Sequence, residues 1–221
     1  MLHSRAREMI AMPTKLVCMP IKSICIQTIF FLCVLVFANP AQAAPPDVRM
    51  ALEEGKPRIE HIDGSFTVAE SDDENVVHAE LLPSGEILLE PKGRGVAHVF
   101  IFADRLVRVV EIAVGVALPE IAPAPDKACA KPRINAACYP AWRVHLQHLE
   151  SKDTPPIEFE LDGLQAEVKE AQAALDRAGI HAQLQASAFG VKLKGVADAA
   201  AERKGLRAIW PLWLGPLRVD R

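Results

Sequence analysis

Residues 59–116 alternate between apolar and polar side chains with the period of two that is typical of β-strands. Turn-forming residues separate the alternating runs, among them Pro83-Ser84-Gly85 and Gly93-Arg94-Gly95. The pattern predicts five strands, at residues 65–69, 76–82, 86–90, 96–103 and 106–114. Short strands joined by tight turns are typical of a small antiparallel β-sandwich. In the fourth strand VAHVFIFA is apolar at consecutive positions, so we expect it to be covered on both faces.

The period changes after residue 156. IEFELD (157–162) predicts a strand, and the next apolar residues recur at helical spacing up to Gly179. HAQLQASA and GVKLKGV predict two further strands, Asp198 is a candidate N-cap for a second helix that Pro211 ends, and LRVD predicts a last strand. The order strand, helix, strand, strand, helix, strand predicts a two-layer α/β module, so we expect an α+β protein.

The N-terminus has the three parts of a secretory signal peptide: Lys22, an apolar run over 24–38, and Ala41-Gln42-Ala43. The apolar run is shorter than the roughly 20 residues of a membrane span. We therefore expect a signal peptide at 1–43, cleavage after Ala43 and a periplasmic protein that could associate with the outer membrane. An uncleaved anchor is the alternative, and translation could begin at Met1, Met12 or Met19.

Proline-rich stretches divide the expected mature chain. We expect an N-terminal extended segment at 44–58, the β-rich domain at 59–118, a Pro-rich connector at 119–156 and the α/β domain at 157–221. Of the five cysteines only Cys129 and Cys138, in the connector, lie outside the leader. In an oxidising compartment they predict one structural disulfide. Their spacing is not the C-x-x-C of an oxidoreductase, and free thiols or pairing with another chain are the remaining alternatives.

The net charge of the expected mature chain excludes one class of protein. Residues 44–221 carry 21 Lys and Arg against 27 Asp and Glu, a net charge of −6, whereas the full chain has −3. This balance excludes a broadly cationic nucleic-acid binder.

Candidate chemistry is sparse. His145 and His148 could be drawn as a metal site, but two ligands do not complete a tetrahedral site, and we expect a solvated pair. The acidic run Glu70, Asp72, Asp73 and Glu74 departs from calcium-loop spacing and is typical of a turn between strands. We expect His98 to be a hydrogen-bonded residue of a core strand. The sequence contains no P-loop, G-x-S-x-G or G-x-G-x-x-G motif, so it predicts no catalytic, cofactor or metal site.

Two surface features remain candidates for binding. Lys192 and Lys194 lie on one face of a predicted strand, where they could make a weak peripheral contact with an anionic membrane or simply face solvent. The tail IWPLWLGPLRV concentrates apolar bulk at Trp210, Leu212, Trp213 and Leu214. Trp is enriched as an anchor at protein interfaces. These four residues are therefore a candidate docking patch, and packing within their own core is the alternative.

Two stretches together resemble a known family. In the first, Lys92, Gly95, Ala97 and Val99 fit the K-x-x-G-x-A/T-x-V signature of the pilus-formation N-terminal domain of CpaC/RcpA-type secretins of tight-adherence (Tad/Flp) pili. In the second, Val191, Leu193 and Gly195 fit the V-x-L-x-G strand of a BON domain. This order of domains behind a signal peptide is similar to the periplasmic region of those secretins. The β-rich secretin pore domain has no counterpart here, and the connector with Cys129 and Cys138 departs from the pattern.

The resemblance implies a non-enzymatic periplasmic component of a Tad/Flp pilus or a related secretion system. It would act by docking to other envelope proteins, such as an outer-membrane secretin, or to copies of itself. A free periplasmic or surface ligand-binding protein with an immunoglobulin-like, adhesin-like sandwich is the alternative. Neither hypothesis implies a cofactor or a nucleic-acid partner.

Overall fold

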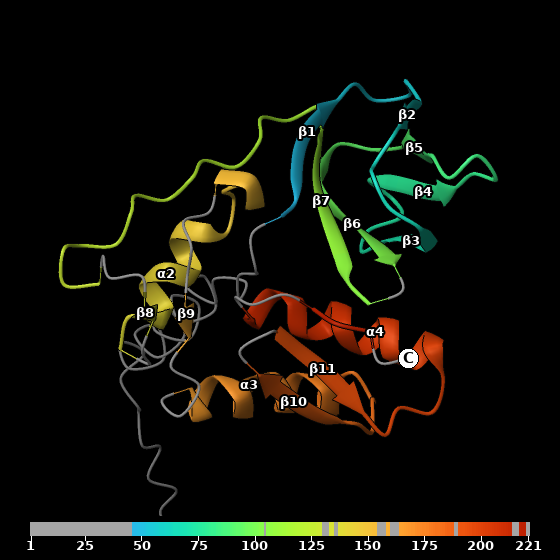
Figure 1. Cartoon of the computed structure of the whole chain (residues 1–221). Helices are drawn as coiled ribbons and strands as arrows, with labels where there is room; N and C mark the ends of the chain where they lie inside the picture. The colour runs from blue at the N-terminus through green and yellow to red at the C-terminus, as the bar shows by residue number, and fades with distance from the viewer. Residues whose placement is uncertain are drawn as a thin grey trace, which may run out of the picture. The chain divides into compact units, whose positions relative to one another are not determined.

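The computed structural model describes residues 46–103, 105–129, 133–134, 137–153, 158–159, 164–187, 190–213 and 217–219 (Figure 1). The expected signal peptide lies outside these residues. The described chain is an α+β protein in which a stretch of strands is followed by a stretch that mixes helices and strands, as the two periodicities predict.

Each of the five strands predicted for residues 59–116 is present, with bounds that differ by one or two residues. They are β3 (Phe66–Ser71), β4 (Val77–Leu81), β5 (Ile87–Pro91), β6 (Gly95–Ala103) and β7 (Val107–Val114). Two strands precede them that the sequence did not predict, β1 (Val48–Leu52) and β2 (Arg58–Glu60). The expected extended segment therefore contributes a strand to a sheet.

The seven strands form two sheets, in the orders β1-β7-β6-β3 and β2-β5-β4. A single apolar cluster contains residues of both, with Val77 and Ile87 from one sheet and Val99 and Ile112 from the other. All pairs are antiparallel except β1 with β7, which is parallel. The antiparallel pairing predicted for the β-rich domain is thus confirmed for its described strands, and the parallel pair is added by β1 from the preceding segment.

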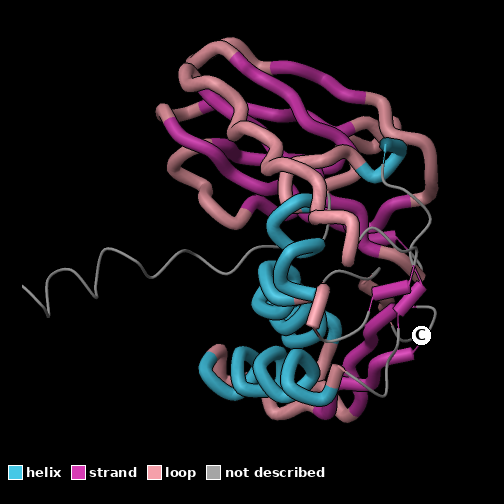
Figure 2. The backbone as a smooth tube through the Cα atoms, turned by 90° about the vertical axis from the view of Figure 1, so that its left-hand side faces the viewer, coloured by secondary structure: helices cyan, strands magenta, loops and turns pink. Residues whose placement is uncertain are grey.

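The second part contains α3 (Gln165–Arg177), a hairpin of β10 (Gln183–Ser187) and β11 (Gly190–Lys194), and α4 (Ala199–Ile209). A short 3-10 helix (Trp210–Leu212) follows at Pro211. Asp198 is the N-cap of α4, since its side chain accepts a hydrogen bond from the Ala201 amide, as predicted. Figure 2 shows both helices on one side of the hairpin, where Leu184, Val191 and Leu193 are buried against them.

Of the predicted first and last strands of this part, the structure describes only residues 158–159 and 217–219. The described pair Glu158–Phe159 (β9) is paired with Arg133–Ile134 (β8) from the connector, in parallel. At the other end Leu217 makes one bridge to Val191. The Leu217 carbonyl also accepts a hydrogen bond from the Val107 amide at the start of β7. The tail is thus shared between β11 and β7.

The connector holds α2 (Tyr139–Leu146) and a short 3-10 helix (Ser151–Asp153). Tyr139, Trp142 and Leu146 bury the inner face of α2 in a cluster with Leu164. Residues 119–126 of the connector have no helix or strand, whereas its α2 segment is folded and packed.

Strand β6 is covered on both faces, which confirms the prediction from VAHVFIFA. Val99 and Ile101 face the core between the two sheets. Phe100 and Phe102 face the opposite way and join a second core with Trp210 and the β10–β11 hairpin. Because this second core draws on both parts of the sequence, residues 41–221 form one compact unit.

Gly205 shows how closely α4 approaches the hairpin. A Cβ atom added there would lie 2.5 Å from Leu193 Cδ1, 3.2 Å from Leu175 Cδ2 and 3.3 Å from Ile180 Cγ2. All three side chains are buried in the second core, so they have little room to shift.

We predict that Gly205→Ala lowers the free energy of unfolding by roughly 1 to 3 kcal/mol through overpacking, although Ala is the better helix former by about 1 kcal/mol. Ala200→Gly, at an exposed position of the same helix, is the control and should cost about 1 kcal/mol through helix propensity alone. Urea unfolding of the two variants measures both effects. Stabilisation by Gly205→Ala would contradict the close approach.

Candidate functional site

The outer face of the four-stranded sheet carries a row of charged side chains that alternate in sign. Arg49 on β1, Glu111 on β7 and His98 on β6 are register partners, so they stand side by side on three adjacent strands. Asp72 follows β3 and continues the row beside His98. Opposite charges directly across neighbouring strands stabilise a sheet. We call Arg49, Glu111, His98 and Asp72 the charge row.

Glu111 is the centre of the charge row, and its side chain is 0% exposed. Its Oε1 accepts a hydrogen bond from Arg49 Nε at 2.8 Å. Its Oε2 pairs with Nδ1 of His148, which follows α2, and lies 3.8 Å from Nε2 of His98. Burying a carboxylate away from water costs free energy unless the carboxylate is paired with a cation or a hydrogen-bond donor. Three cationic or hydrogen-bonding groups from three segments of the chain supply that pairing.

His98 is held from its other side by Asp72. The Asp72 carboxylate accepts from the His98 backbone amide at 2.7 Å and pairs with His98 Nδ1 at 2.9 Å. The Trp210 ring lies against the imidazole, with ring centroids 4.6 Å apart. The prediction of a hydrogen-bonded histidine in a core strand is confirmed. His98 therefore belongs to the charge row and also contacts the second core through Trp210.

These contacts fix the ionisation of both central groups. Burial alone would lower the pKa of His98, but its hydrogen bonds and attraction to Asp72 and Glu111 outweigh burial and raise that pKa to about 9. Burial alone would raise the pKa of Glu111, but its bonds to His148, His98 and Arg49 lower that pKa to about 2. At neutral pH His98 is a cation and Glu111 an anion.

The charge row attaches the connector to the sheet rather than presenting groups to a substrate. Besides Glu111, the Arg49 guanidinium donates to the carbonyl of Pro119 at the start of the connector, and His148 reaches Glu111 from its end. Glu111 has no exposed surface from which to reach a reacting molecule. Its role is that of an internal tie.

His145 and His148 do not form the solvated pair that was expected. His148 is bound to the buried Glu111, and its side chain is only 13% exposed. His145 Nδ1 pairs with the carbonyl of Ala122 at 2.9 Å. Over the described ranges no group of three or more His, Cys, Asp or Glu residues could hold a metal ion.

The acidic run is divided among separate contacts. Glu70 binds Arg203 Nε at 2.7 Å and Arg207 at 2.9 Å, and so ties β3 to α4. Asp72 belongs to the charge row, and Asp73 accepts from the Asn75 amide in the turn before β4. The run is a turn with structural contacts, as the sequence indicated.

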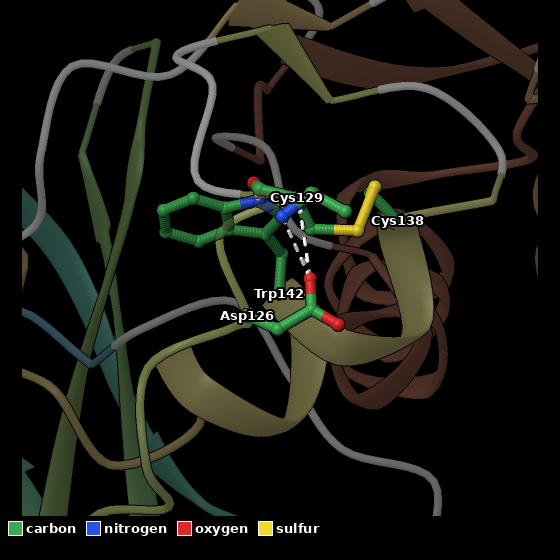
Figure 3. The surroundings of a disulfide bond; sticks show 5 residues. Asp126, Cys129, Cys138 and Trp142 are labelled. Atoms are coloured by element: carbon green, nitrogen blue, oxygen red, sulfur yellow. Dashed lines mark hydrogen bonds between the residues drawn. A yellow bond between two sulfur atoms is a disulfide. The ribbon is translucent and has the colours of Figure 1, made fainter.

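Cys129 and Cys138 are joined by a disulfide (Figure 3). Trp142 on α2 donates its indole N–H to the Cys129 carbonyl at 2.8 Å. Asp126 Oδ1 accepts from the amides of Ala128 and Cys129, which closes the turn before the bond. The disulfide thus anchors the loop to the start of α2.

The candidate docking patch is internal. The side chains of Trp210, Leu212 and Trp213 are 5%, 4% and 1% exposed. The hydroxyl of Tyr139 on α2 donates to the Leu212 carbonyl at 3.1 Å. These three residues pack within their own chain, the alternative that the sequence left open, and Trp210 and Trp213 belong to the core that covers Phe100 and Val109. Leu214 lies outside the described residues.

A cavity of about 250 Å³ lies between the sheet and the start of α4. It is lined by Thr67, Phe102, Val196, Asp198, Ala199, Glu202, Arg203 and Val219. Asp198 caps α4 and Arg203 is bound to Glu70, so both charges have structural partners. The Thr67 hydroxyl donates to the Phe102 carbonyl at 3.1 Å. The lining offers a mixed polar and apolar surface rather than an activated nucleophile.

The lysines of β11 face away from the second core. Val191 and Leu193 are buried toward α3 and α4, while Lys194 is exposed and Lys192 half-buried. The alternation predicted for this strand is confirmed.

No protein-family model matches this chain, and no curated protein matches it either. No helix among the described residues is long and apolar enough to cross a membrane.

Sequence reasoning missed the charge row. The signal was a single glutamate within VRVVEIAV, a strand that is otherwise apolar apart from Arg108. A charge buried in an otherwise apolar strand requires a buried partner, but only the sheet order shows that His98 and Arg49 are opposite it.

The charge row predicts a stability plateau between about pH 4.5 and 6.5. The His98 contribution is complete below its unfolded pKa near 6.5 and is lost as pH rises through about 9. The Glu111 contribution is complete above about 4.5 and is lost as pH falls through about 2. Each limb should be worth roughly 2 to 3 kcal/mol, partly from the same His98–Glu111 attraction. Urea unfolding midpoints from pH 2 to 10 measure both limbs.

Glu111→Gln is the control for this pH profile. It removes the anion and leaves His98 and Arg49 without their shared partner, so it should destabilise the protein at neutral pH by about 3 to 5 kcal/mol. It should abolish the acid limb and reduce the alkaline limb, which Asp72 still supports through His98. A variant that keeps the wild-type pH profile would show that other groups cause it.

The disulfide predicts a redox-dependent stability. Cys129 and Cys138 are separated by 9 positions in the sequence. For a loop of this length the chain-entropy model gives a stabilisation of about 2 to 3 kcal/mol. We expect the oxidised protein to lose this amount on reduction with dithiothreitol, measured by urea unfolding. Cys129→Ser/Cys138→Ser should match the reduced protein and ignore the reductant. Equal stability of oxidised and reduced wild type would contradict the role of the bond as a staple.

Proposed function

We propose that this protein is a non-enzymatic, exported component of a Tad/Flp-type pilus assembly or related secretion system. It acts in the periplasm by docking to other envelope proteins. In this proposal the seven-strand part is a pilus-formation-like β-sandwich, and the part from residue 157 onward is a BON-like module.

The observation that carries the proposal is the place of the two motifs in the fold. Val191 and Leu193 of the V-x-L-x-G motif lie on β11 and are fully buried. Gly195 ends that strand with a φ of +78°, a conformation that favours glycine. A BON-like strand needs these residue types at these positions.

The first motif supports the same proposal. Gly95 begins β6 with a φ of +155°, and a Cβ there would lie 2.9 Å from Val76 Cγ2. Ala97 and Val99 follow at alternate positions and are buried in the core between the sheets. The glycine and the two inward residues of the pilus-formation signature therefore have packing reasons in this chain.

The charged groups support docking over catalysis. Glu111, His98, Glu70 and Arg203 are engaged with one another or with neighbours in the fold. What the chain offers to a partner is therefore its strand edges and its solvent-facing polar surfaces.

The cavity beside α4 supports a second candidate function. A free periplasmic or surface ligand-binding protein would use such a mixed polar and apolar recess. Neighbouring genes discriminate between the two: prepilin, ATPase and secretin genes favour the pilus proposal, and an isolated locus favours the ligand-binding protein.

Export and docking are tested together in the native host. We expect the mature protein in the periplasmic fraction to begin at Ala44, by N-terminal mass spectrometry. Pull-down from the envelope should recover pilus or secretion components, and deletion of the gene should reduce piliation or secretion. A leaderless version, starting with Met before Ala44, is the control and should stay in the cytoplasm without complementing the deletion. Intact piliation and secretion after deletion, with no such component recovered, would refute the proposal.

A further inference from the structure

Strand β10 has one paired edge and one outer edge. It pairs with β11 in antiparallel register, with Gln183 opposite Lys194 and Ser187 opposite Gly190. In such a strand the N–H and C=O of one residue point the same way, and successive residues alternate. Since the Leu184 amide is bound by the side chain of Gln172 on α3, residues 182, 184 and 186 point their backbone groups away from β11.

Gln172 occupies only the first part of this outer edge. Its side-chain amide donates from Nε2 to the Ala182 carbonyl at 2.9 Å and accepts at Oε1 from the Leu184 amide at 3.0 Å. It binds the strand as a peptide group of a neighbouring strand would. Beyond it, the Leu184 carbonyl and both backbone groups of Ala186 accept or donate no hydrogen bond within the described residues.

The outer edge lacks the usual protection against pairing. Natural edge strands carry charges, prolines or bulges that prevent addition of another strand. β10 reads QLQAS, with no charge and no proline, and its register with β11 has no bulge.

The apolar layer beneath this edge is incomplete. Val168 precedes Gln172 by one turn of α3, about 6 Å along the helix axis, and β10 runs in the opposite direction with about 6.6 Å for every two residues. Val168 therefore stands beside Ala186. Both are only partly buried where they pack on the second core. A strand added here would cover them with its inward side chains.

The side chains on the face of the hairpin that points away from the second core determine which charge an added strand should carry. Gln183 and Gln185 on β10 are opposite Lys194 and Lys192 on β11, and the hairpin strands contain no acidic residue. Lys side chains are long enough to reach across one strand. Because Lys194 is exposed, the outward side chains of an added strand would lie within reach of its positive charge.

We propose that the outer edge of β10 binds an extended segment of a partner protein, one that alternates apolar and acidic residues and adds to the β10–β11 hairpin as a further strand. The inference deepens the proposed docking function and rests on it for the source of the partner. Main-chain hydrogen bonds to Leu184 and Ala186 supply affinity, and the alternating side chains supply specificity.

The test uses the whole mature chain and a fluorescent synthetic peptide that alternates Val and Glu. We expect saturable binding by fluorescence anisotropy, NMR shift changes centred on the amides of Leu184 and Ala186, and weaker binding at high salt. A peptide alternating Val and Lys should bind at least about tenfold more weakly, as should the Val–Glu peptide methylated on its backbone nitrogens.

Variants locate the site. Ala186→Pro removes the outward amide without breaking a bond to β11, so the chain should fold and bind about tenfold more weakly. Gln185→Ala alters the polar face but not the edge, and should bind within about twofold of wild type. Lys194→Glu keeps every backbone group and should reverse the preference between the two peptides, which tests the charge argument even if Ala186→Pro does not fold.

Three results would overturn the proposal: no saturable binding of the Val–Glu peptide, unchanged affinity in folded Ala186→Pro, or shift changes confined to other elements. Self-association of the protein alone that Ala186→Pro abolishes would assign the edge to a second copy and overturn the partner strand. Because the peptide test needs no pilus component, its failure is distinct from a failure of the envelope pull-down.

Discussion

The buried carboxylate of Glu111 is the constraint on which the arrangement of this protein depends. An anion with no solvent exposure must be compensated by groups brought from elsewhere in the chain. Arg49 arrives from the first strand, His98 from the neighbouring strand and His148 from the connector. The parallel pairing of β1 and the return of the connector to the sheet place two of these groups beside Glu111, and Trp210 packs against the third, His98.

The second core depends on the same sheet face. Beyond the charge row, that face becomes apolar at Phe100, Phe102 and Val109, and these side chains are covered by Trp210 and the β10–β11 hairpin. Hydrophobic burial holds this half, and the Glu70 contacts to α4 fix its lateral position. One face of one sheet thus packs against both the connector and the C-terminal part. The contacts between these parts are ion pairs and buried side chains, as they are within each part.

Periodicity predicted what depends on local sequence. The five hairpin strands, both long helices, the Asp198 cap and the covered faces of β6 could be inferred, because alternation and capping are short-range signals. Other features could not be inferred, because each depends on contacts between segments that are distant in the sequence. They are the two short strands at the start, the pairing of β9 with β8 and the division of the tail between β11 and β7. The tryptophans illustrate the same limit. Their bulk was visible in the sequence, but only the aromatic outer face of β6 explains why they are buried against the sheet.

The two-sided burial of β6 also sets an order of events during synthesis. Its inner face can be buried as soon as β7 and the second sheet have formed. Phe100 and Phe102, however, are not fully covered until the β10–β11 hairpin and Trp210, far later along the chain, have been synthesised. The nascent chain therefore carries an aromatic strip that must wait for its own C-terminus, and non-local contacts of this kind slow folding. Such a strip is a natural binding site for a chaperone, and the completed fold conceals it.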